Sequence, residues 1–120
     1  MPVTIVKPED RDLSASDPKQ SRAPTSVSTN TRFRVLSEDQ PYVHIVQTKR
    51  NVTIPLHSHT APEVTIVLEG NVKVGGELCP PGTVLIIPAN AEYDLEIQDE
   101  DLTFVVVRPS RGRYQESNAG

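Results

Sequence analysis

The chain has 120 residues, enough for one domain with a single hydrophobic core but not for two. Its formal net charge of −4 and the lack of a basic stripe argue against a nucleic-acid partner. No apolar run approaches the roughly 20 residues that a membrane-spanning helix needs. The single cysteine, Cys79, excludes an internal disulfide, and the N-terminus lacks the apolar core of a signal peptide, so we expect a cytoplasmic protein.

Residues 1–31 are predicted to form an N-terminal arm outside the main domain. Residues 1–6 could form a short edge strand, since residues 3–6 are all β-branched. Residues 7–31 are rich in Pro, Ser, Asp, Lys and Thr and offer little to bury. We therefore expect an extended or flexible arm that lies over the domain or pairs across a dimer.

Residues 32–108 alternate short aliphatic runs with turn signals, and the polar residues 109–120 are expected to form a tail. Aromatic residues make up only 4% of the chain, so Val, Ile and Leu must build the core, which favours sheet. Gly75-Gly76 is typical of a hairpin turn, and Cys79 follows it in a segment expected to be a turn, where a packing role is favoured over a catalytic thiol. This spacing indicates an all-β sandwich or barrel. The predicted strands cover 32–36, 42–49, 52–56, 63–68, 71–74, 83–87, 91–98 and 102–108.

The most specific pattern is a His-x-His pair, His57 and His59, followed by Glu63. Side chains alternate in an extended segment, so the two imidazoles point the same way, and a proline on either side disfavours a helix. Two imidazoles and one carboxylate form the triad of non-heme Fe(II) sites and also suit Zn, Mn, Ni or Co. We therefore predict that His57, His59 and Glu63 bind a divalent metal ion.

The alternative interpretation is two surface histidines and a solvated glutamate. Two of the three histidines in the chain fall in this pattern, which disfavours chance. Glu63 also opens an apolar run, Val64-Thr65-Ile66-Val67-Leu68, which is typical of a buried strand, where an unpaired carboxylate would be costly. The metal interpretation is therefore preferred.

This pattern resembles the first motif of the cupin superfamily: a glycine, five residues, His-x-His, three or four residues, a glutamate, six residues and a glycine. His57, His59, Glu63 and Gly70 fall at these spacings, and Asn51 stands at the first glycine. The resemblance extends over about residues 42–108. It implies a cupin jelly-roll barrel, a double-stranded β-helix, with a divalent metal ion (Fe, Zn, Mn or Ni) inside.

The second cupin motif is matched only in part. Its pattern is a glycine, five residues, Pro-x-Gly, two residues, a histidine, three residues and an asparagine. Gly82 and Pro88 match, whereas Asn90, Tyr93 and Ile97 replace the second glycine, the histidine and the asparagine. Asparagine tolerates a positive φ, so Asn90 can still form the turn. By this resemblance, Tyr93 stands where the family places its fourth metal ligand.

Tyr93 and His44 are the candidate catalytic residues. Tyr93 shares the apolar face of its strand with Leu95 and Ile97. It could be a weak fourth metal ligand, a hydrogen-bond donor to a metal-bound water, an acid/base group, or a core tyrosine. His44 shares a face with Tyr42 and could act as a general base, although a lone strand histidine is more often solvated or structural.

An apolar pocket inside the barrel is expected to hold a small organic molecule. Its polar groups are few, and the charge of the substrate stays open. Arg32 and Arg34 share a face of the first strand and could reach a carboxylate, but strand-end arginines are mostly solvated. The residues expected to line the pocket are Thr53, Thr65, Val67, Leu95, Ile97 and one face of residues 102–107.

Three functions fit these residues. The first is a metal-dependent enzyme, either a dioxygenase or a Lewis-acid lyase or isomerase. The second is a non-catalytic module that binds a small ligand, and the third is a structural protein with a metal as a staple. We favour the enzyme because three protein ligands leave open positions on a metal, as catalytic sites do.

A homodimer is expected from the outward face of the strand at 63–68. Val64, Ile66 and Leu68 alternate with the inward residues and would face water without a covering partner. The N-terminal arm or the second sheet could also cover this face. A second copy of the chain is the preferred partner.

Overall fold

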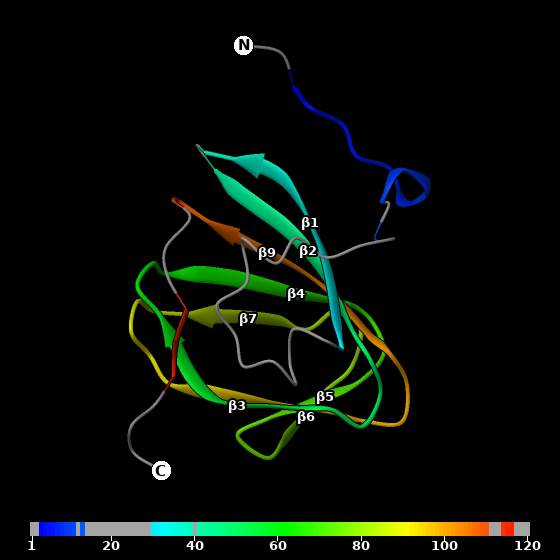
Figure 1. The fold of residues 1–120 in the computed structure, drawn as a ribbon, viewed down its shortest axis with the longest axis vertical. Coiled ribbons are helices and arrows are strands. Elements are labelled where there is room, and N and C mark those ends of the chain that lie inside the picture. Colours follow the sequence, from blue (N-terminus) through cyan, green and yellow to red (C-terminus); the bar gives the residue numbers. More distant parts are fainter. Residues whose placement is uncertain (1–2, 12, 14–29, 40, 111–113, 117–120) are drawn as a thin grey trace.

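The structure, a computed structural model, describes residues 3–11, 13, 30–39, 41–110 and 114–116. In these residues two five-stranded antiparallel sheets face each other, with strand orders β1-β2-β9-β4-β7 and β10-β3-β8-β5-β6 (Figure 1). This arrangement confirms the predicted all-β jelly roll. The elements are η1 (Pro8–Asp10), β1 (Thr31–Glu38), β2 (Tyr42–Thr48), β3 (Thr53–His59), β4 (Glu63–Glu69), β5 (Val72–Val74), β6 (Glu77–Cys79), β7 (Val84–Ile87), β8 (Tyr93–Ile97), β9 (Leu102–Arg108) and β10 (Tyr114–Glu116).

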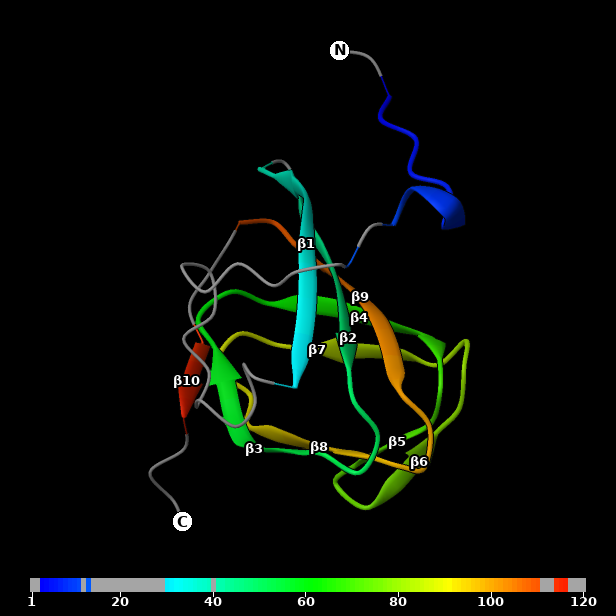
Figure 2. The same ribbon diagram turned by 45° about the vertical axis from the view of Figure 1, so that its right-hand side comes forward.

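All of the predicted strands exist, with ends shifted by a few residues, and two short strands were not predicted. β6 follows the Gly75-Gly76 turn and ends at Cys79, so the expected turn at this cysteine was wrong. β10 lies within the expected polar tail and pairs with β3, as Figure 2 shows. Residues 3–6, expected as an edge strand, form no strand. No helix among the described residues is long and apolar enough to cross a membrane.

The core fills the space between the two sheets. Its residues come from the inward faces of both sheets, because alternate side chains of each strand point toward the facing sheet. Val, Ile and Leu predominate, as the low aromatic content requires. The buried cluster consists of Phe33, Val46, Ile54, Val67, Val72, Cys79, Leu95, Ile97, Leu102, Phe104 and Val106.

Several turns of the described residues contain a residue with a positive φ. Asn51 has φ 61° and Asn90 has φ 64°, which confirms the prediction that Asn90 adopts the conformation of the missing glycine. The Asn90 amide donates to the carbonyl of His59 at 2.8 Å, so this turn holds the end of β3. Gly70 has φ 81°, and a Cβ there would overlap the carbonyl oxygen of Asp101. Only glycine fits at this position.

An irregularity in β3 changes which residues face the core. The pairing of β3 with β8 shifts register between Ile54 and His57. As a result Ile54 and His57 are both buried although they are three positions apart, and Thr53 is exposed. The expectation that Thr53 lines the interior with His57 was therefore wrong, because it assumed unbroken alternation.

Candidate metal centre

The two predicted histidines lie together on the inward face of β3. His57 is 2% exposed and His59 is partly buried, and their ring centroids are 5.0 Å apart. β3 is flanked by β8 on one side and β10 on the other, so neither edge of the segment with the histidines is open. The i, i+2 spacing thus brings both imidazoles to one place, as the sequence predicted.

The orientation of His57 is set by its own strand. Its Nδ1 lies 2.8 Å from the carbonyl oxygen of Pro55, and because a carbonyl can only accept, Nδ1 donates. The neutral ring then carries its lone pair on Nε2, the arrangement that metal-binding histidines use. Burial lowers the pKa of His57, against the smaller opposing effects of the Pro55 hydrogen bond and Glu63, and so favours the neutral ring.

Glu63 lies at the start of β4 and is 4% exposed. Its Oε2 accepts a 2.6 Å hydrogen bond from Thr65 Oγ1. Its Oε1 lies 3.2 Å from Arg108 Nη2 and 3.4 Å from Arg108 Nε. Glu63 is therefore buried, not solvated. Its carboxylate is paired, as a buried charge requires.

Arg108, the last residue of β9, belongs to the candidate site and was missed by sequence reasoning. β2, β9 and β4 are neighbours, with Tyr42 opposite Arg108 and Val64 opposite Val107. This register places Tyr42, Arg108 and Glu63 in a row across the sheet. The guanidinium carbon lies 5.7 Å from the centre of the Tyr42 ring. Alternation along residues 102–108 puts Arg108 on the inward face, so its burial could have been predicted from the sequence. Its pairing with Glu63 could not, because that depends on the order of the strands in the sheet.

Arg108 also contacts His59. Nη2 lies 3.3 Å from His59 Nδ1, and since arginine has no acceptor, Nδ1 accepts. The neutral ring in this arrangement carries its proton on Nε2, which is 3.7 Å from Glu63 Oε1. Burial, and next the charge of Arg108, lower the pKa of His59 to about 3.

His57, His59 and Glu63 are suitable metal ligands by residue type, but their side chains are not positioned around a common point. Two neutral imidazoles and a carboxylate form a suitable donor set for a divalent ion. However, no group of three or more His, Cys, Asp or Glu side chains in the described ranges is arranged as a metal site. Instead, Arg108 contacts both Glu63 and His59. To bind a metal together with His57, Glu63 and His59 would have to give up their contacts with Arg108.

Tyr93 and His44 border the same cluster. Tyr93 is opposite His57 in the β3–β8 ladder, and its ring centroid lies 4.3 Å from that of His57 and 6.1 Å from that of His59. It is partly buried and also packs against the core, so both a site role and a core role fit it. His44 Nδ1 lies 3.1 Å from the Tyr42 hydroxyl, and its charge is among the influences on His59.

Comparisons with solved structures identify the fold. No family model and no curated protein sequence matches the chain. The polyketide cyclase RemF from Streptomyces resistomycificus superposes with a TM-score of 0.75 at 21% identity, over 98% of this chain and 87% of that one. An RmlC-like cupin protein from Ralstonia eutropha gives 0.68 at 14% identity, over 90% and 69%. The chain has a cupin fold.

A third structural neighbour is longer than this chain. The DMSP lyase DddQ from Ruegeria pomeroyi superposes with a TM-score of 0.61 at 16% identity. The match covers 85% of this chain but 55% of that protein. At these identities the similarity concerns the fold.

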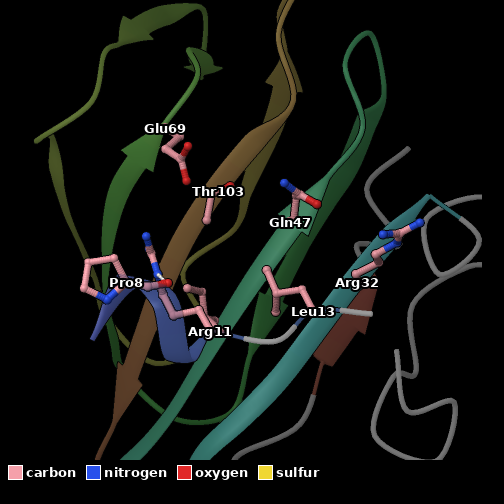
Figure 3. A pocket seen from close by; sticks show the side chains of 8 residues that line it. Pro8, Arg11, Leu13, Arg32, Gln47, Glu69 and Thr103 are labelled. Atoms are coloured by element: carbon pink, nitrogen blue, oxygen red, sulfur yellow. Dashed lines mark hydrogen bonds between the residues drawn. The ribbon is translucent and has the colours of Figure 1, made fainter. Parts of the chain in front are cut away.

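The chain also has a cavity of about 340 Å³ on the outer face of the β1-β2-β9-β4 sheet. Figure 3 shows the N-terminal segment and the strands that surround it. Arg32 lines it and is exposed, and Arg34 is exposed too, so neither is directed at the cluster between the sheets. The lining residues are Pro8, Arg11, Leu13, Arg32, Ile45, Gln47, Glu69 and Thr103.

Proposed function

We propose that this cupin is a metal-dependent enzyme that acts on a small organic molecule bound between its sheets. The observation that carries the proposal is the cluster of one buried and one partly buried imidazole, both favoured in the neutral form, and a buried carboxylate on facing strands. Buried polar groups cost stability unless they are fully partnered, so such a cluster is typical of a functional site. Two of the structural neighbours, a polyketide cyclase and a DMSP lyase, are enzymes with the same fold.

In this proposal His57, His59 and Glu63 hold the metal, which is Fe, Zn, Mn or Ni. A bound Fe(II) would supply O₂ chemistry, whereas Zn, Ni or Mn would supply Lewis-acid catalysis for a lyase or isomerase. Tyr93, 4.3 Å from His57 between ring centroids, serves as a fourth ligand or as a proton donor. His44, held by the Tyr42 hydroxyl, serves as a general base.

One observation favours a second candidate, a non-catalytic module that binds a small ligand. Arg108 forms an ion pair with Glu63, so the negative charge of this carboxylate is balanced without a metal. In this candidate Arg108 and the neutral imidazoles provide hydrogen bonds to the ligand. The metal content of the protein separates the two candidates.

The experiment is elemental analysis of protein purified without added metal, followed by titration with zinc. We expect stoichiometric metal in the wild type and its loss in His57→Ala, because this imidazole directs its Nε2 lone pair into the site. His44→Ala is the matched control, since it also removes an imidazole but should keep the metal. Tyr93→Phe keeps the metal if the phenol is an acid/base group and loses it if the phenol is a ligand. Equal metal in His57→Ala and wild type would remove the assignment.

We also propose that a second copy of the chain covers the outer face of β4, β7 and β9. Ile86, Val64 and Val107 form an apolar row across these strands, and Ile86 is 79% exposed. Such a face is typical of a homodimer interface. Light scattering should give twice the monomer mass, and Ile86→Glu should reduce it. Leu78→Glu, at an exposed position of β6 in the other sheet, should not. A monomeric wild type at high concentration would contradict the dimer.

The cytoplasmic location belongs to the same proposal. It rests on the single cysteine, which fits a reducing compartment. Fractionation of the producing cells would test it.

A further inference from the structure

The cavity on the outer face of the β1-β2-β9-β4 sheet is separate from the candidate metal centre. Thr103 lines it near the start of β9, whereas Arg108 ends that strand. Side chains alternate along a strand, so residue 103 faces outward and residue 108 faces the space between the sheets. The N-terminal segment forms the opposite wall through Arg11 and Leu13 (Figure 3). A volume of about 340 Å³ is at the lower end of the range for ligand sites, so it suits a small molecule.

The polar side chains of this cavity have few partners in the protein. Thr103 is 3% exposed, yet its hydroxyl makes no hydrogen bond with the part of the chain that the structure describes. Within the same residues, the side chains of Arg32, Gln47 and Glu69 make no hydrogen bond or ion pair either. Arg11 uses only its Nε, which donates to a backbone carbonyl at 3.3 Å. Buried polar groups are normally hydrogen-bonded, so these side chains are available to a ligand.

The donors and acceptors of the cavity define the ligand that fits it. Guanidinium groups only donate hydrogen bonds, so Arg11 and Arg32 call for an acceptor, and a carboxylate matches their planar fork best. An ionised carboxylate only accepts, so Glu69 calls for a hydrogen-bond donor on the ligand. The Thr103 hydroxyl can serve either group. Ile45, which is 1% exposed, adds an apolar wall.

We propose that this cavity binds a small carboxylate with a neighbouring hydroxyl or amino group, as in an α-hydroxy or α-amino acid. The guanidinium groups of Arg11 and Arg32 bind the carboxylate, and Glu69 and Thr103 bind the neighbouring donor. The apolar remainder of the ligand packs against Ile45. This site requires no metal and none of the residues between the sheets, so it is independent of the proposed enzymatic function.

The test is an NMR titration of ¹⁵N-labelled protein with four probes of similar shape. Mandelate has a carboxylate and a hydroxyl, and phenylglycine has a carboxylate and an ammonium group. Phenylacetate lacks the donor, and mandelamide lacks the negative charge. We expect mandelate or phenylglycine to bind about tenfold more tightly than phenylacetate and mandelamide. The backbone amides of Gln47 and Thr103 should shift, and the stronger of the two ligands identifies the preferred donor.

Variants assign the contacts. Arg11→Gln and Arg32→Gln should each weaken binding by about tenfold, because each removes a charge-assisted hydrogen bond. Thr103→Val keeps the shape of the side chain and removes a hydroxyl that has no partner in the described chain, so this variant should fold as the wild type does. It should lose part of the preference for mandelate over phenylacetate. Arg34→Gln is the matched control, since Arg34 is exposed on the same strand and does not line the cavity.

Four outcomes would overturn the proposal. The first is equal binding of mandelate and mandelamide, and the second is undiminished binding in the double variant Arg11→Gln/Arg32→Gln. The third is the absence of shifts at Gln47 and Thr103 with every probe up to its solubility. The fourth is shifts confined to His57 and its neighbours, which would place the ligand in the candidate metal centre. The first three leave the metal-dependent function untouched, because metal analysis decides that question separately.

Discussion

The two ends of the space between the sheets differ in kind although the same strands supply both. β4 begins with Glu63 and reaches Val67, while β9 runs the opposite way from Leu102 to Arg108. Because the strands are antiparallel, both polar residues lie at one end and both apolar residues at the other. The apolar end is formed by side chains of the buried hydrophobic cluster. The polar end depends on a few specific pairs, so chemistry and packing are segregated along each strand.

This difference predicts that equal truncations have unequal consequences. At the apolar end a deletion removes contacts and leaves a cavity. At the polar end a deletion leaves the partner as an unpaired buried charge. The proposed site thus lies at the end where single changes are expected to cost the most stability.

The largest effect is expected for Glu63→Ala. Removal of one partner of a buried ion pair costs about 3–5 kcal/mol, here because Arg108 loses its carboxylate. Urea denaturation measures the loss. The double variant Glu63→Ala/Arg108→Met should regain much of it, since no charge is then left buried. A double variant no more stable than the single one would show that the pair is not the cause.

Leu102→Ala tests the apolar end, where a loss of about 2–5 kcal/mol is expected from the buried side chain, which is 1% exposed. The zinc affinity of the folded variant should equal that of the wild type, because Leu102 lies at the far end of β9 from Arg108. Paired denaturation and zinc titrations give both quantities. A weakened zinc affinity would show that the two ends are coupled.

Acid should weaken the polar end gradually. The folded pKa of His59 is lowered to about 3, below the ordinary value of 6.5, so between these pH values the unfolded chain binds a proton that the folded chain does not. Stability therefore falls as the pH drops below 6.5, by up to about 1.4 kcal/mol per pH unit. The lowered pKa of His57 acts in the same direction. Denaturation of His59→Gln against wild type at several pH values should show a shallower slope in the variant, and parallel slopes would contradict this assignment.

The sequence predicted the fold because strand signals are local. Alternation and turn residues identified the strands, and Asn90 was correctly predicted to replace a glycine at positive φ. β6 and β10 were missed because β6 lies in the Gly- and Pro-rich segment expected to be a turn, and β10 lies in the polar segment expected to be a tail. β10 is recognised instead by its backbone pairing with the edge of β3.

The candidate site was predictable in part for the same reason. His57 and His59 are two residues apart, so alternation alone places them together. Arg108 and Glu63 are 45 residues apart, and their contact depends on the order β9-β4 in the sheet. The set of metal ligands therefore stays a prediction. The ion pair between Arg108 and Glu63, which occupies one of these ligands, could be found only from the structure.

The sole cysteine of the chain gives a built-in probe of motion. Cys79 is 6% exposed within the apolar cluster, and burial is the first cause that raises the pKa of its thiol. A thiol in this state does not react with an alkylating reagent until the β5–β6 hairpin opens. The rate of alkylation under native conditions thus reports local opening at the packed end, with no engineered label and at a distance from the residues proposed to bind a ligand.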